Sequence, residues 1–127
     1  MMETGLKETS RMTVDEARTA RQMGSGDLDV LATPALVALM ENAAMRAVAA
    51  HLPDGATTVG ALMHTTHLKP TAVGQTVEAT AVLTAVEGRK LTFEVRATDN
   101  EGLVGEGTHV RYVVDRDRFL SKLTGRG

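Results

Sequence analysis

One acidic side chain interrupts an apolar stretch with helical spacing. In TPALVALMENAAM, residues 33–45, Glu41 is the only charged residue. At 100° per residue it lies beside Val37 and away from the polar strip of Asn42 and Arg46, and the residues three and four positions away are all apolar. Such a carboxylate either reaches water or an arginine at the rim of the core, or lies in a cleft where it serves as a base or nucleophile.

The four histidines differ in how well they suit a role as catalytic acid or base. His51 follows the helix, where a cation interacts favourably with the helix dipole. His64 and His67 form an H-x-x-H pattern in a predicted strand, where residues three apart point to opposite faces, and the chain has no cysteine. We therefore expect no metal site and no cofactor, and either of these two histidines is a candidate acid or base. His109 shares a face with Arg111, which favours a structural or interface role.

Strand alternation also decides which neighbours each histidine has. If no bulge interrupts the strand, His67 shares its face with Met63, whereas His64 shares its face with Gly60.

Several basic residues are candidates for holding an anionic ligand. Arg111 lies in a strand beside Gly105 and Gly107, which would let a ligand approach the backbone. The other candidates are Lys69 and the pair Arg89 and Lys90, which more simply form a solvated hairpin. The G-x-G pattern here lies inside a strand, which is the wrong context for a dinucleotide-binding loop.

These side chains must be positioned by one helix and a sheet. Thr33 is the predicted N-cap, Pro34 the first helical residue, and the helix is expected to run to about His51. Alternation and short glycine-containing joints predict strands over residues 6–14, 57–68, 76–86, 90–99 and 103–114. We also expect a mobile loop over residues 24–29 and a short amphipathic helix in DRDRFLSKL.

An antiparallel meander curled around one long central helix is the hot-dog architecture, of class α+β. The helix is apolar on nearly all sides, which indicates that the sheet wraps it. Such a sheet leaves exposed edges, so we expect a homodimer, possibly a dimer of dimers.

The composition limits the remaining choices. A chain of 127 residues fits a single domain over residues 1–127, and with 2% aromatic residues its core must be built from Val, Leu, Ala and Met. The net charge of -2 predicts no general attraction to nucleic acid or to an anionic membrane. The N-terminus lacks the apolar stretch of a signal peptide and no run is long enough to span a membrane, so we expect a cytoplasmic protein.

Four segments together resemble the fluoroacetyl-CoA thioesterase-like branch of the hot-dog thioesterase superfamily: VLATPALVALMENAAMRAV, VGALMHTTHLKPTAVGQTV, VEGRKLTFEV and GEGTHVRYVV. The resemblance extends from about Val30 to Phe119. It implies hydrolysis of an acyl-CoA thioester to a carboxylic acid and coenzyme A, at a site between two subunits.

The resemblance also implies roles for individual residues. Thr33, Glu41 and His67 would form the catalytic group, with Gly60 near the acyl group and Arg111 near the ligand or coenzyme. Glu41 would either attack the thioester directly or deprotonate a water, Thr33 would orient it or the water, and His67 would be the acid–base partner.

One departure from that family concerns the substrate. The fluoroacetyl-CoA enzyme carries aromatic lid residues before its catalytic threonine, whereas this chain has GSGDLDVLA there. We therefore expect a short or medium acyl group rather than fluoroacetyl-CoA. The alternatives are a non-catalytic hot-dog protein that binds acyl-CoA or another small ligand, and an acyl-CoA hydratase or dehydratase.

Overall fold

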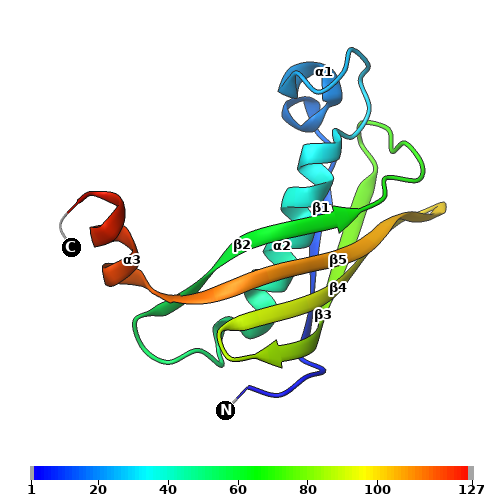
Figure 1. Ribbon diagram of the computed structural model, residues 1–127. Coiled ribbons are helices and arrows are strands. Elements are labelled where there is room, and N and C mark those ends of the chain that lie inside the picture. The colour runs from blue at the N-terminus through cyan, green and yellow to red at the C-terminus, as the bar shows by residue number, and fades with distance from the viewer. Residues whose placement is uncertain (1, 126–127) are drawn as a thin grey trace.

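The chain folds as one long helix packed across a curved antiparallel sheet (Figure 1). The computed structural model describes residues 2–125. The sheet has the order β1-β3-β4-β5-β2. The elements, in chain order, are β1 (Lys7–Thr13), the 3-10 helix η1 (Glu16–Arg18), α1 (Ala20–Met23), α2 (Thr33–Ala49), β2 (Ala56–Thr65), β3 (Thr76–Glu87), β4 (Lys90–Asp99), β5 (Gly102–Asp115) and α3 (Arg116–Leu123). This arrangement is the predicted α+β architecture.

Tight hairpins set the register of the sheet. Glu87 pairs with Lys90 across a turn of two residues, Gly88 and Arg89, and Gly88 has a φ of 63°. Glycine adopts a positive φ without steric cost, which is why the turn begins there. β1 and β2 lie at the two edges of the sheet, so each leaves one side of its backbone without a strand partner among the described residues.

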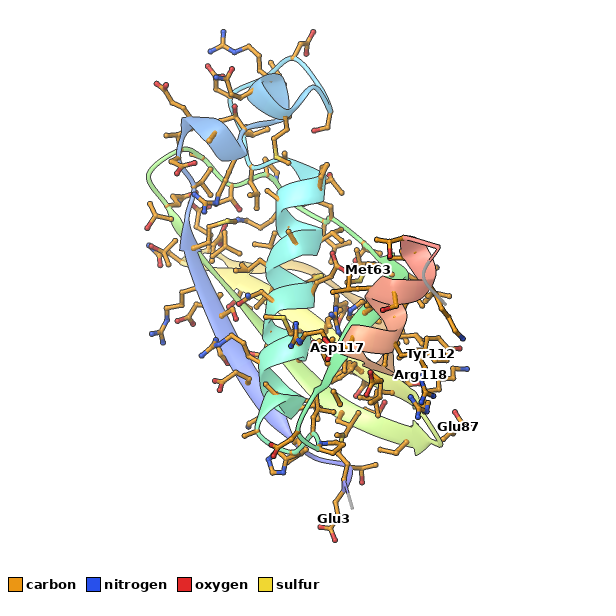
Figure 2. The ribbon with its side chains drawn as sticks, turned by 90° about the vertical axis from the view of Figure 1, so that its left-hand side faces the viewer. Glu3, Met63, Glu87, Tyr112, Asp117 and Arg118 are labelled. Carbon is orange, nitrogen blue, oxygen red and sulfur yellow. The ribbon has the colours of Figure 1, made fainter. Side chains whose placement is uncertain are left out.

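The core lies between α2 and the sheet and is aliphatic, as the composition predicts. Eight residues of α2 are buried and Val37 is half-buried. Phe93 on β4 is the largest fully buried side chain. Figures 1 and 2 show α2 lying across one face of the sheet. The buried helix residues are Ala35, Leu36, Leu39, Met40, Ala43, Ala44, Ala47 and Val48.

The prediction that Thr33 is the N-cap of this helix is wrong. Ala32 occupies the cap position and makes no side-chain capping bond, while Thr33 is the first helical residue and Pro34 follows it. Proline is tolerated there because the N–H groups of the first helical turn have no partner within the helix. The Thr33 hydroxyl instead contacts His67 at 2.7 Å, so a tertiary hydrogen bond has replaced the cap.

A bulge in β2 changes which side chains share a face. Gly60 pairs with Arg111 and Leu62 pairs with Val110, which leaves Ala61 as the extra residue. Gly60 consequently faces α2 together with Met63, and the assignment of Gly60 to the face of His64 is wrong. β2 also ends at Thr65, so His67 lies beyond the strand rather than within it.

The segment between β1 and α2 holds two short helices that the sequence does not predict, and the segment after β5 holds one that it does. η1 and α1 precede the expected loop, where Arg21 forms an ion pair with Asp29 at 2.8 Å. α3 matches the predicted amphipathic helix and follows β5 directly (Figure 1). Among residues 2–125, no helix has the length and apolar character needed to cross a membrane.

Candidate active site

Thr33 and His67 form a hydrogen-bonded pair where α2 begins. The Thr33 Oγ1 lies 2.7 Å from His67 Nδ1. Burial lowers the pKa of His67 and the neighbouring backbone of Lys69 partly offsets this, so the imidazole is neutral at pH 7. Its Nε2 is buried and has no hydrogen-bond partner among residues 2–125. The ring is therefore oriented on one side by Thr33 and has one nitrogen available for a ligand or a neighbouring chain.

The segment that carries His67 continues past the end of β2 alongside β5. The Thr66 N–H donates to Glu106 O at 3.0 Å and the Leu68 N–H donates to Val104 O at 2.6 Å.

Two glycines of β5 permit this close approach. A Cβ on Gly107 would lie 2.0 Å from the His64 carbonyl oxygen, and one on Gly105 would lie 2.3 Å from the Thr66 carbonyl oxygen. The expectation that these glycines admit a ligand is wrong, because the protein's own chain occupies the space.

Glu41 points toward the sheet and lies against β2 and β5. Its Oε2 is 3.8 Å from the Arg111 guanidinium, and its side chain is 41% exposed. A Cβ on Gly60 would be 2.6 Å from the same oxygen, so the absence of a side chain at Gly60 is what admits the carboxylate. The ionic partner that the helix itself does not provide comes from β5.

Arg111 is the buried cation of this cluster. Its side chain is 7% exposed, and it donates to Thr58 Oγ1 at 2.8 Å and to Thr58 O at 3.0 Å. Burial lowers the pKa of Arg111 and Glu41 raises it. Tyr112, the next residue, is exposed on the side of the sheet away from α2 (Figure 2). The guanidinium thus contacts Thr58 and Glu41. It lies buried beside the carboxylate rather than on a surface open to coenzyme phosphates.

His109 supports Arg111 from the same face of β5. Its Nδ1 lies 2.7 Å from Leu62 O, so Nδ1 carries the proton and donates it to the carbonyl. Nε2 is then free to accept from Arg111 at 3.2 Å. Burial, the largest cause, lowers the pKa of His109, which keeps the ring neutral as this arrangement requires. The sequence predicts a structural or interface role for His109, and the contact with Arg111 is of the structural kind. Nothing in the sequence indicates Thr58, because it lies 53 residues from Arg111.

The predicted catalytic residues fall into two clusters, which we call the threonine–histidine pair (Thr33 and His67) and the glutamate cluster (Glu41, Gly60 and Arg111). Thr33 and Glu41 are eight positions apart in the helix, which is about 12 Å along the axis. No hydrogen bond or ion pair among residues 2–125 joins the two clusters.

A cavity of about 260 Å³ adjoins the threonine–histidine pair. Its lining includes Thr33, His67, Leu31, Leu68, Lys69 and Ser25. Within residues 2–125, no group of three or more His, Asp or Glu side chains is placed to hold a metal ion. The available chemistry is that of a carboxylate, an imidazole and a hydroxyl, which suits addition of water to a carbonyl carbon.

Comparison with known proteins gives a consistent result. The family model described as fluoroacetyl-CoA-specific thioesterase (FlK) matches residues 14–117. A fluoroacetyl-CoA thioesterase from Streptantibioticus cattleyicolor is 41% identical over 95 residues, which cover 75% of this chain and 68% of that protein.

Solved structures agree in fold. A threonine-to-serine variant of the fluoroacetyl-CoA enzyme FlK in complex with acetyl-CoA superposes with a TM-score of 0.93 at 34% identity, covering 98% of both chains. A thioesterase superfamily member from Thermus thermophilus, at 23% identity and a TM-score of 0.88, covers 99% of this chain and 96% of its own and supports the fold alone. The hot-dog fold and the family resemblance are thereby confirmed, and the chain belongs to the fluoroacetyl-CoA-specific thioesterase family.

Proposed function

We propose that this protein hydrolyses a short or medium acyl-CoA thioester to a carboxylic acid and coenzyme A. Membership of a thioesterase family makes thioester hydrolysis the activity to expect. The observation that carries the proposal is the Glu41 carboxylate, which is held against Gly60 of the edge strand β2 and the buried Arg111 of the neighbouring strand β5.

The reaction breaks the bond between the acyl carbon and the sulfur of coenzyme A, and forms a bond from that carbon to a water oxygen. Glu41 either accepts a proton from the attacking water, or attacks the carbon itself and forms a mixed anhydride that water then opens. In both routes coenzyme A leaves as a thiolate and takes up the proton that the water has lost. His67 is our acid–base partner for this transfer, and Thr33 fixes its ring.

A second copy of the chain would unite the two clusters. β2 is an edge strand, and its residue Leu62 is 51% exposed. Pairing of two β2 strands would extend the sheet and place Glu41 of one copy near the interface with the other. We therefore infer a homodimer with sites between the subunits. Light scattering at micromolar concentration checks this, and a monomer that retains full activity would contradict it.

The cavity favours a small, unsubstituted acyl group. Leucine and alanine side chains line it together with Ser25, and the chain before Thr33 contains no aromatic residue. We propose that acyl groups of a few carbons are preferred and that fluoroacetyl-CoA is not selected over acetyl-CoA.

A panel of acyl-CoA esters tests the activity through release of free thiol. We expect turnover of at least one short or medium ester. Thermal stabilisation by the esters without thiol release would instead indicate a binding protein. Consumption of an enoyl-CoA without thiol release would indicate a hydratase.

A further inference from the structure

A carboxylate outside both clusters lies where three segments of the chain meet. Asp99 is the last residue of β4, and its side chain is 0% exposed. Its Oδ2 accepts hydrogen bonds from Lys69 Nζ and, at 2.9 Å, from Thr71 Oγ1, while its Oδ1 accepts from the Glu101 N–H at 2.8 Å. Desolvation raises the pKa of Asp99, but the hydrogen bonds from Lys69, Glu101 and Thr71 together outweigh it and leave the pKa lowered. The side chain is therefore an anion that ties the β4–β5 turn to residues 69–71.

One branch of this network leads to His67. Lys69 is two residues further along the chain and lines the same cavity as His67, and its backbone lies close enough to the imidazole to raise the pKa of His67 against the larger effect of burial. The Lys69 side chain forms an ion pair with Asp99 and is itself 26% exposed. Fixing the Lys69 ammonium thus restrains the short segment on which His67 stands, beyond the last paired residue of β2.

The other branch leads to Thr33. The Thr71 carbonyl accepts a hydrogen bond from the Leu31 N–H at 2.9 Å, and the Thr71 side chain is completely buried. Leu31 lies two residues before Thr33, at the entry to α2. The hydroxyl of Thr71 contacts Asp99 while its backbone contacts Leu31, so a single residue couples the carboxylate to the start of the helix.

We propose that Asp99 is a positioning residue that holds both members of the threonine–histidine pair in register, His67 through Lys69 and Thr33 through Thr71. This inference rests on the proposed function. Asp99 and Thr71 do not line the cavity beside the pair, so they act through other residues rather than through the substrate. An asparagine at position 99 would have to direct an N–H group at one of three donors, and the network would then be broken.

Two substitutions of the network separate this role from general stability. Asp99→Asn removes the charge at nearly constant volume, and Thr71→Val removes the hydroxyl that joins Asp99 to the Leu31 segment. Because reacting groups misplaced by about 1 Å lose of the order of 100-fold in rate, we expect kcat to fall by about 10- to 100-fold in both variants, with a smaller change in KM. Thr71→Ser keeps the hydroxyl and should recover most of kcat.

Glu78→Gln is the matched control, because it breaks an ion pair with Arg11 on the exposed part of β3. We expect it to leave kcat unchanged.

An NMR titration of His67 gives a readout that does not depend on turnover. A loosened segment would expose the imidazole to water, so its pKa should rise toward the ordinary value in Asp99→Asn and Thr71→Val, and should stay low in Glu78→Gln and Thr71→Ser. An unchanged titration in folded Asp99→Asn and Thr71→Val proteins, with native kcat, would overturn the positioning role. A wild-type protein that releases no thiol would instead overturn the proposed function, and the titration would still decide the role of Asp99.

Discussion

A methyl group added at Gly60 should disable the glutamate cluster without unfolding the protein. In Gly60→Ala, the new Cβ would lie 2.6 Å from Glu41 Oε2 but 3.4 Å from Arg111 and from His109. The last two distances are ordinary contacts, so the buried arginine and histidine can stay in place. The Glu41 side chain is 41% exposed and has room to swing toward solvent. The clash therefore falls on the carboxylate.

The size of the effect follows from the required movement. To restore an ordinary contact of 3.4 Å, Oε2 must move by about 0.8 Å, and a misplacement of about 1 Å costs of the order of 100-fold in rate. We expect kcat to fall by about 30- to 100-fold, which corresponds to about 2 to 2.7 kcal/mol of transition-state stabilisation. The free energy of unfolding should change by less than about 1 kcal/mol, because alanine fits a strand and restricts the unfolded chain.

Thiol release at saturating acyl-CoA and a thermal unfolding curve measure both quantities. A double-mutant cycle shows whether Gly60 acts through Glu41. In a Glu41→Gln background, Gly60→Ala should reduce the remaining rate by much less than 30-fold, because residues in contact typically show coupling energies of about 0.5–3 kcal/mol. A folded Gly60→Ala protein with native kcat would refute the reasoning, and so would full additivity in the cycle.

Three further predictions follow from the contacts of individual residues. Thr33→Ala should lower kcat while changing the free energy of unfolding by no more than about 1 kcal/mol, because Thr33 is not the helix cap. Thr33→Ser should keep most of kcat. A large loss of stability of Thr33→Ala in urea would contradict this. Gly107→Ala should lower the free energy of unfolding by about 1–3 kcal/mol or more, because its Cβ meets a backbone carbonyl that cannot move aside, and a native melting temperature would disprove it. The pKa values of His67 and His109 are lowered in the folded protein, so below pH 6.5 the unfolded chain binds more protons than the folded one. The stability that the two neutral histidines contribute is therefore present above pH 6.5 and is lost as the pH falls through 6.5 toward the folded pKa. Urea unfolding should show a free energy of unfolding that decreases from pH 7.5 to 5.5. The same decrease should be seen in His64→Gln, a control that removes an exposed histidine. A free energy of unfolding that rises as the pH falls over this interval would exclude His67 and His109 as the cause.

The fold was largely predictable where local pattern and tertiary structure agree. β4 has the predicted bounds, residues 90–99, because strict alternation and a two-residue hairpin leave little freedom in its register. The bulge at Ala61 could not be predicted, because it depends on how β2 pairs with β5, and no local signal marks it. The cap assignment of Thr33 failed for a similar reason, since a residue 34 positions away captures the hydroxyl.

The candidate site was predictable in its members more than in its arrangement. Periodicity singled out Glu41, and the family resemblance chose His67 over His64. The sequence could not predict that Thr33 and His67 form one cluster and Glu41 another, because this depends on the tertiary structure. An arginine partner for Glu41 was one of the predicted alternatives, but which arginine it is could not be predicted, because strand register alone brings Arg111 opposite Gly60. The catalytic roles, the dimer, the single domain over residues 1–127 and the cytoplasmic location stay predictions.

The most direct test of the account replaces Glu41 by glutamine and measures thiol release from the best acyl-CoA substrate. The substitution keeps the size of the side chain and removes its charge and basicity. We predict that the Glu41→Gln protein folds with a native unfolding curve and loses at least about 100-fold in kcat, a typical contribution of general base catalysis. Hydrolysis at the native rate by this folded protein would contradict the central claim that Glu41 carries the chemistry.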